Sequence, residues 1–259
     1  MKDKVIWITG ASSGLGRELA ILLHKQGSKL LLSGRNLDAL VELNESLHGE
    51  HTLLAFDLAE PNRIPSIAKK ALSLFPRIDI LILCGGISQR NLFIESSAEL
   101  DKLIMDVDFF SNSALARAVV PQMIENKGGR IVVISSLAGI FGYPLRSAYS
   151  AAKHALQGYF ETVRTELHKD NIQVTIVSPG RIRTQISFNA LLADGSPQGT
   201  MDYGQAHGMD PAKCAAKIIR AIRHNKKDVY LGWPDKLLIY IYRFIPSLYH
   251  KLIRRLNVR

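Results

Sequence analysis

Short apolar runs alternate with longer amphipathic segments along most of the chain. The apolar runs are continuous rather than alternating, which is typical of strands that are buried on both faces of a parallel sheet. Six such runs predict strands at 5–8, 30–32, 53–56, 80–83, 131–134 and 174–177, and a seventh, short strand is predicted at 228–231. Helical patterns separate them at 14–27, 36–48, 62–75, 98–127 and 147–170. This alternation predicts right-handed βαβ crossovers and therefore an α/β fold, with a doubly wound, seven-stranded parallel sheet of the Rossmann type and helices on both faces.

The length of 259 residues suits one α/β domain with a single large core. We assign residues 1–232 to that domain and residues 233–259 to a C-terminal tail. One segment, residues 185–210, is rich in Gly, Ser, Gln and Asp and is too long for an ordinary connection. We therefore predict that it is a substrate-binding loop or lid.

The net charge of +10 lies in the last part of the chain, because residues 213–259 hold 12 Lys or Arg against 2 Asp or Glu. In the tail, basic positions cluster on one side of a helical wheel: Lys236, Arg243, His250 and Arg254. The other side is apolar: Leu237, Leu238, Ile241, Tyr242, Leu248, Tyr249, Leu252, Ile253 and Leu256. Pro246 should divide this segment into two helices.

Two interpretations of the tail remain open. Its apolar side could pack on the substrate cleft or on another subunit, or residues 234–259 could lie on an anionic membrane surface. Nucleic acid is not an expected partner, because the charge sits on an apolar tail without a reader fold.

The cellular setting follows from what the sequence lacks. Residues 1–4 run directly into a predicted strand without the apolar stretch of a signal peptide, and no run reaches the length of a membrane span. The two cysteines, Cys84 and Cys214, have no paired metal-ligand spacing, so no metal site is expected and both are predicted to be reduced. We expect a cytoplasmic protein, with the cytoplasmic membrane surface as its location if the tail binds lipid.

A glycine-rich turn follows the first predicted strand and precedes a helix. The sequence Thr9-Gly-Ala-Ser-Ser-Gly-Leu-Gly16 would present backbone N–H groups and the positive end of a helix dipole to a pyrophosphate. Its Gly-x-x-x-Gly-x-Gly spacing differs from the common Gly-x-Gly-x-x-Gly fingerprint. The candidate cofactor-binding residues of this turn are Gly10, Ser12, Ser13, Gly14, Leu15 and Gly16.

The second predicted strand is followed by Arg35, and no carboxylate appears before Asp38. An acidic residue at this place binds the ribose 2′-hydroxyl of NAD, whereas an arginine suits the 2′-phosphate of NADP. We therefore predict NADP(H) as cofactor in preference to NAD(H).

Three residues form a candidate set for acid–base chemistry. Ser136 ends the fifth predicted strand, and Tyr149 and Lys153 share one face of the next helix. A phenol has an ordinary pKa of about 10, and a nearby ammonium favours the phenolate. With Ser136 holding a carbonyl oxygen, Tyr149 could donate a proton to that oxygen during reduction and remove it during oxidation.

These motifs together resemble the short-chain dehydrogenase/reductase family over nearly the whole chain. The matching pieces are the glycine turn, Asp57, Ser136, Tyr149-x-x-x-Lys153 and Pro179-Gly-x-x-x-Thr184. The resemblance implies NAD(P)-dependent interconversion of a ketone or aldehyde and an alcohol, with Lys153 binding the nicotinamide ribose. It implies further cofactor contacts from Asp57, Leu58, Gly85, Pro179, Gly180, Ile182 and Thr184. Homo-oligomers are also implied, because relatives often pair through the helices at 98–127 and 147–170.

Within that family the chain is similar to the group around dehydrogenase/reductase member 7 and its 7B relative. The similar segments are 85–90, 189–196 and 226–229. The resemblance suggests a bulky, apolar or lipid-like carbonyl substrate. Ser88, Gln89 and Arg90 are candidate substrate residues, together with Ser136, Tyr149 and the loop 185–210.

The sequence departs from the family pattern at two places. The family's Asn-Asn-Ala-Gly is here Leu83-Cys-Gly-Gly86, and the helix asparagine of the usual proton relay is replaced by Asp108. Asp108 could join the catalytic set through its main-chain carbonyl, stabilise the Lys153 ammonium through its carboxylate, or point away as a surface charge. These departures also leave an alternative function, a catalytically silent dinucleotide-binding protein that docks through its tail.

Overall fold

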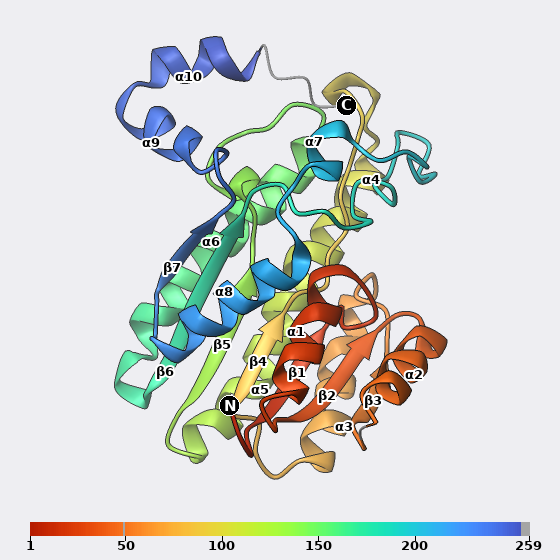
Figure 1. The fold of residues 1–259 in the computed structure, drawn as a ribbon, viewed down its shortest axis with the longest axis vertical. Helices are drawn as coiled ribbons and strands as arrows, with labels where there is room; N and C mark the ends of the chain where they lie inside the picture. Colours follow the sequence, from red (N-terminus) through yellow and green to blue (C-terminus); the bar gives the residue numbers. More distant parts are fainter. Residues whose placement is uncertain (49, 255–259) are drawn as a thin grey trace.

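The computed structural model describes residues 1–48 and 50–254. Its centre is one parallel sheet of seven strands in the order β3-β2-β1-β4-β5-β6-β7 (Figure 1). The predicted fold class is confirmed. The strands are β1 (Val5–Thr9), β2 (Lys29–Gly34), β3 (Thr52–Ala55), β4 (Ile80–Leu83), β5 (Gly129–Ile134), β6 (Ile172–Pro179) and β7 (Asp228–Leu231).

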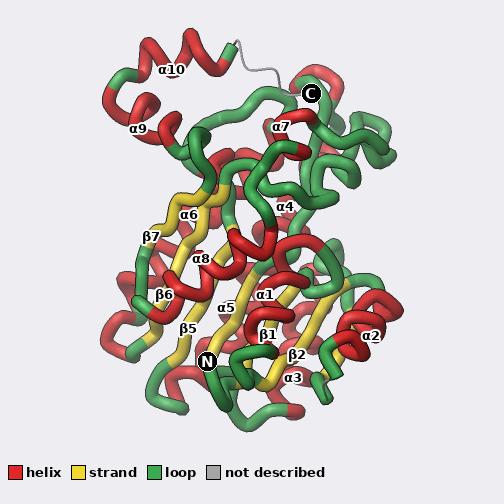
Figure 2. Tube along the Cα trace, in the orientation of Figure 1, coloured by secondary structure: helices red, strands yellow, loops and turns green. Residues whose placement is uncertain are grey.

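Helices cover both faces of the sheet (Figure 2). One face packs against α1 (Gly14–His24), α2 (Leu37–Ser46) and α8 (Pro211–Arg223). The other packs against α3 (Ile64–Leu74), α5 (Ser111–Glu125) and α6 (Ser147–Glu166). The remaining helices are α4 (Ala98–Met105), α7 (Tyr203–Ala206), α9 (Leu237–Phe244) and α10 (Pro246–Ile253).

The continuous apolar strands follow from this double covering. In β1, Ile6 and Ile8 belong to the core beside α1, and Trp7 between them belongs to the core beside α3 and α5. All three side chains are fully buried. Because neighbouring strand residues point to opposite faces, a sheet with two covered faces needs apolar residues at every position.

The segment predicted as one helix at 98–127 has an interruption. It comprises α4 and α5, with a π-helical turn at Asp106–Phe110 between them. The Asn112 carboxamide donates hydrogen bonds to the carbonyls of Val107 and Asp108 within this turn. Such turns are frequent at functional sites. Asp108 lies in this one and is buried.

The tail forms two helices, α9 and α10, as predicted from the position of Pro246. Pro246 is the first residue of α10, where its missing N–H costs nothing. Ile239, Tyr249 and Ile253 are buried against Leu137 and Phe141, and the Tyr249 hydroxyl donates to the Gly142 carbonyl at 2.7 Å. The inner side of the tail therefore packs on the domain near the carboxyl ends of the strands (Figure 1).

The predicted division of the tail into two faces holds only in part. Ile239, which was not assigned to the apolar face, is buried, whereas Leu237 from that face is 44% exposed. Ile239 packs in the cluster that contains Leu137 and Phe141, so contact with the domain decides which side of α9 is buried. Leu256 lies outside the described residues. Within residues 1–48 and 50–254, no helix combines the length and apolar character needed to cross a bilayer.

Candidate active site

Two adjoining pockets open where the carboxyl ends of the strands meet. The first follows the glycine turn and the ends of β4, β5 and β6; we call it the nucleotide pocket. The second lies between the segment after β5, the loop 185–210 and the start of the tail; we call it the substrate pocket. Six residues line both: Ser88, Ser136, Tyr149, Gly180, Ile186 and Gln205.

The glycine turn has the backbone that a dinucleotide requires. Gly10 has a φ of +67°, and a Cβ there would lie 2.7 Å from the Gly85 Cα. A Cβ on Gly16 would collide with the Gly10 carbonyl. No side chain caps the first turn of α1, so its N–H groups remain available to a phosphate beside the pocket. These residues fit a bound dinucleotide.

Most of the predicted cofactor residues line the nucleotide pocket. They are Gly10, Ser13, Gly14, Leu15, Gly16, Gly85, Tyr149, Lys153, Pro179, Gly180, Ile182 and Thr184.

The other four predicted cofactor residues lie beside this pocket, near the carboxyl ends of β2 and β3. The Ser12 hydroxyl lies next to Gly34, and a Leu58 methyl lies next to Gly85. Arg35 is largely exposed, and its Nη1 is 3.9 Å from an oxygen of Asp57. Arg35 is therefore free to meet an anion at this end of the groove.

The candidate acid–base residues Tyr149 and Lys153 lie close together, as the helical spacing predicts. Tyr149 and Lys153 are both buried on α6, and the Lys153 Nζ is 5.5 Å from the centre of the Tyr149 ring. The same Nζ donates to the Ile134 carbonyl at 3.3 Å. Ser136, which follows β5, accepts a hydrogen bond from the Ala138 N–H at 3.1 Å. A carbonyl compound in the substrate pocket could thus reach a phenol and a serine hydroxyl together.

Asp108 forms a buried ion pair with Lys153. Its Oδ2 is 3.1 Å from the Lys153 Nζ, and its Oδ1 accepts from the Ile87 N–H at 2.7 Å. Burial lowers the pKa of Lys153, but the facing Asp108, Tyr149 and Cys84 outweigh it and leave that pKa raised. Burial also raises the pKa of Asp108, against the opposing effect of Lys153. Of the three interpretations of Asp108, the geometry therefore supports stabilisation of the Lys153 ammonium by the carboxylate. The main-chain carbonyl of Asp108 accepts a hydrogen bond from the Asn112 carboxamide.

The ends of β1 and β4 stay connected although Leu83-Cys-Gly-Gly86 replaces the family's Asn-Asn-Ala-Gly. The Thr9 Oγ1 accepts from the N–H groups of Cys84 at 3.1 Å and Gly85 at 3.2 Å. This hydroxyl joins the ends of β1 and β4 in the absence of the asparagines. Burial raises the pKa of the Cys84 thiol to about 12, so it stays protonated at neutral pH.

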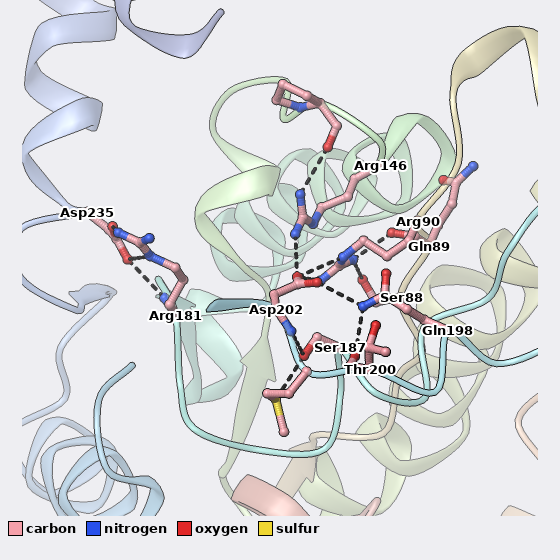
Figure 3. A network of polar contacts seen from close by, with 12 residues as sticks. Ser88, Gln89, Arg90, Arg146, Arg181, Ser187, Gln198, Thr200, Asp202 and Asp235 are labelled. Carbon is pink, nitrogen blue, oxygen red and sulfur yellow. Dashed lines mark hydrogen bonds and ion pairs between the residues drawn. The ribbon is translucent and has the colours of Figure 1, made fainter. Parts of the chain in front are cut away.

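The substrate pocket contains buried charges that the sequence did not reveal as a group (Figure 3). One oxygen of Asp202 accepts from the Arg90 Nε at 2.9 Å and Nη2 at 2.7 Å, and from the Arg146 Nη2 at 3.1 Å. All three side chains are at most 11% exposed. Burial and the neighbouring Arg90 lower the pKa of Arg146 to about 10. Two guanidinium groups therefore share one carboxylate, which leaves one positive charge uncompensated.

The predicted substrate residues divide between two places. Ser88 and Arg90 line the substrate pocket, and the Ser88 hydroxyl accepts from the Arg90 Nη1 at 2.8 Å. Gln89 is fully buried and lines neither pocket, because its carboxamide is bonded to the start of α6. Asp202 lies in the loop 185–210, which was predicted to line this pocket, although its ion pairs were not predicted. Sequence reasoning missed other lining residues: Phe141, Tyr143, Arg146, Arg181, Asp235 and Leu238. Among these residues, only Arg146 could have been suspected from the sequence, because it is a cation three residues before Tyr149.

Comparisons with known proteins agree with this geometry. A sequence model described as "short chain dehydrogenase" matches residues 4–192. Dehydrogenase/reductase SDR family member 7B from Bos taurus is 40% identical, over 98% of this chain and 81% of its own. Dehydrogenase/reductase SDR family protein 7-like from Drosophila melanogaster is 38% identical, over 100% of this chain and 82% of its own.

Solved structures show the same fold. A short-chain dehydrogenase from Streptomyces avermitilis has a TM-score of 0.83 and 28% identity, covering 99% of both chains. One from Burkholderia phymatum, in complex with NAD, has a TM-score of 0.83 and 23% identity over 95% of both chains. With the matching residues gathered at two adjoining pockets, the chain belongs to the short-chain dehydrogenase/reductase family of oxidoreductases and is similar to its member 7 and 7B group.

Proposed function

We propose that this protein interconverts a ketone or aldehyde and an alcohol with NADP(H), acting mainly as a reductase. When bound, the dinucleotide supplies or accepts the hydride. Ser136 orients the carbonyl oxygen, Tyr149 donates the proton to it, and the Lys153 ammonium favours the phenolate and binds the ribose. The observation that carries the proposal is that Ser136 and Tyr149 line both pockets. An intact set of these residues disfavours a catalytically silent binding protein.

The preference for NADP(H) rests on Arg35. Its side chain is largely exposed at the end of β2 and has only a 3.9 Å contact with Asp57. A charged hydrogen bond to the 2′-phosphate contributes about 1.5–3 kcal/mol. Arg35→Ala should therefore weaken NADPH binding about 10- to 100-fold and change NADH binding less than about twofold, measured by fluorescence titration.

A matched control is Arg63→Ala, because Arg63 is also an exposed arginine paired with a carboxylate, Glu60. This control should leave both affinities unchanged. Equal losses for NADPH and NADH in Arg35→Ala would contradict the preference.

The substrate we propose is a bulky, largely apolar or lipid-like carbonyl compound that carries an anionic group. Leu137, Phe141 and Leu238 provide an apolar wall in the substrate pocket. The shared Asp202 leaves one guanidinium charge without a counterion there, and a buried charge without a partner is costly. An anionic group of the substrate would compensate that charge.

A panel of long-chain ketones, each as the free carboxylate and as its methyl ester, tests this proposal by NADPH absorbance. The carboxylates should have the higher kcat/KM. Arg146→Gln should lower kcat/KM for them about tenfold or more and leave the esters within about twofold, because a charge-assisted hydrogen bond is lost. Arg146→Lys should retain part of the preference. If the esters react as well as the carboxylates in the unchanged protein, the proposal that the substrate carries an anionic group is wrong.

We further propose that the protein works in the cytoplasm as a homo-oligomer and that its tail contacts the anionic cytoplasmic membrane surface. Phe244 and Ile245 are 75% and 50% exposed between the two tail helices, beside the basic Arg243. In sedimentation assays, vesicles with anionic lipid should bind the protein, and neutral vesicles should bind it more weakly. Phe244→Glu should reduce binding without changing turnover of a water-soluble substrate. Equal binding by both proteins would contradict the contact.

A further inference from the structure

Gln89 connects the start of α6 to the segment after β4. Its carboxamide oxygen accepts from the N–H of Ala148 at 3.0 Å and, more weakly, from that of Tyr149 at 3.4 Å. Its nitrogen lies 3.2 Å from the Ser96 hydroxyl and 3.4 Å from the Ser147 hydroxyl, to which it donates. Figure 3 shows the carboxamide directed away from the guanidinium groups of the substrate pocket.

These contacts replace a missing helix cap. Ser147 is the first residue of α6, and the side chain of the preceding Arg146 makes no capping hydrogen bond. A cap normally accepts from the second and third N–H groups of a helix. In α6 these belong to Ala148 and Tyr149, both buried, and buried N–H groups require a partner. Gln89 supplies that acceptor from 59 residues earlier in the chain.

The main chain of the same segment holds the substrate loop. Leu191 pairs with Gln89 in an isolated β-bridge, in which the Leu191 N–H donates to the Ser88 carbonyl at 2.8 Å and the Arg90 N–H donates to the Leu191 carbonyl at 2.9 Å. The Gln89 carbonyl accepts from the Arg90 guanidinium at 2.6 Å. Gln89 thus lies where α6, the loop 185–210 and the charged cluster meet.

We propose that Gln89 is a positioning residue for the reaction: it caps α6 from a distance and sets the place of Tyr149 relative to the two pockets. The proposal rests on the proposed role of Tyr149. Gln89 lines neither pocket, so it acts through the backbone of the tyrosine and not on the substrate.

Gln89→Met tests this directly, because methionine has a similar volume and can neither accept from the two N–H groups nor donate to the serines. We expect kcat to fall about 10- to 100-fold, as for a small displacement of a reacting group. KM and the dissociation constant of NADPH should stay within about twofold, since the substrate and nucleotide contacts remain. Gln89→Glu should restore most of kcat, because its oxygens still accept from the two N–H groups and from a rotated Ser147 hydroxyl, while the Ser96 hydroxyl keeps donating to Asp101.

Unchanged kcat in a folded Gln89→Met protein would overturn the proposal. So would a rise in KM or in the NADPH dissociation constant as large as the loss of kcat, because either would indicate a direct contact. If Gln89→Met does not fold, Gln89→Asn provides the test: it remains polar but is too short to reach α6, and it should lose kcat in the same way.

Failure of this proposal and failure of the proposed function are distinguishable. If Tyr149→Phe retains activity, the acid–base role is wrong, whatever Gln89→Met does. If Tyr149→Phe is inactive and Gln89→Met is fully active, only the positioning role is wrong.

Discussion

Tyr149→Phe is expected to abolish turnover and to leave NADPH binding nearly intact. The change removes one hydroxyl, the group that would exchange a proton with the carbonyl oxygen at the junction of the two pockets. Loss of a general acid–base group costs about 10²- to 10⁴-fold in rate. The NADPH affinity should change little, because it depends on the glycine turn and on Arg35. Single-turnover absorbance gives the rate, and fluorescence titration gives the affinity.

Tyr143, a second tyrosine of the substrate pocket, provides the control for this experiment. Tyr143 lines the same pocket, stacks on Phe141 and lies under the Arg146 guanidinium, but unlike Tyr149 it does not line the nucleotide pocket. Tyr143→Phe removes the same atom and should leave kcat within a few-fold. Comparable losses in both variants would indicate that any hydroxyl of the pocket matters, and normal turnover in Tyr149→Phe would refute the mechanism.

The sequence predicted the elements whose signals are local. Four consecutive apolar residues indicate that a strand such as Ile80–Leu83 is buried, and the glycine spacing after β1 indicates a phosphate-binding turn. Tyr149 and Lys153 meet because helical spacing alone places them on one face. The sheet, the lining of the nucleotide pocket and the proximity of Tyr149 to Lys153 could therefore be predicted from the sequence.

The features that escaped prediction depend on contacts between distant segments. Arg90 and Asp202 are 112 residues apart, and nothing near either residue marks it as a partner of the other. Ser88, Gln89 and Arg90 were predicted together as substrate residues, but neighbouring residues of an extended segment point in opposite directions, and Gln89 lines neither pocket. The interruption of the helix at Asp106–Phe110 was not predicted either, because these five residues include no Gly or Pro, the residues that usually mark a break in a helical pattern.

Asp108→Asn is expected to make activity more sensitive to alkaline pH. Asn can still accept from the Ile87 N–H but carries no negative charge. Without that charge, burial lowers the pKa of Lys153 with only Tyr149 and Cys84 opposing it. The ammonium is then lost at a lower pH, so the alkaline limb of kcat/KM should move to lower pH. The variant should remain folded, since this position is asparagine in the family pattern.

Asp106→Asn is the matched control, because Asp106 lies two residues away and pairs with the exposed Lys102 instead. It should leave the alkaline limb of kcat/KM unchanged.

Asp108→Leu tests the contribution of the ion pair to stability. It leaves the buried ammonium without its partner and should destabilise the fold by about 3–5 kcal/mol at neutral pH. The pKa of Lys153 is raised in the folded state, so the stability that the pair contributes is complete below the ordinary lysine pKa and is lost as pH rises through the raised value. The difference in unfolding free energy between Asp108→Leu and the unchanged protein should therefore shrink in alkaline buffer. A difference that stays constant, together with an unmoved alkaline limb in Asp108→Asn, would show that the carboxylate does not stabilise the ammonium.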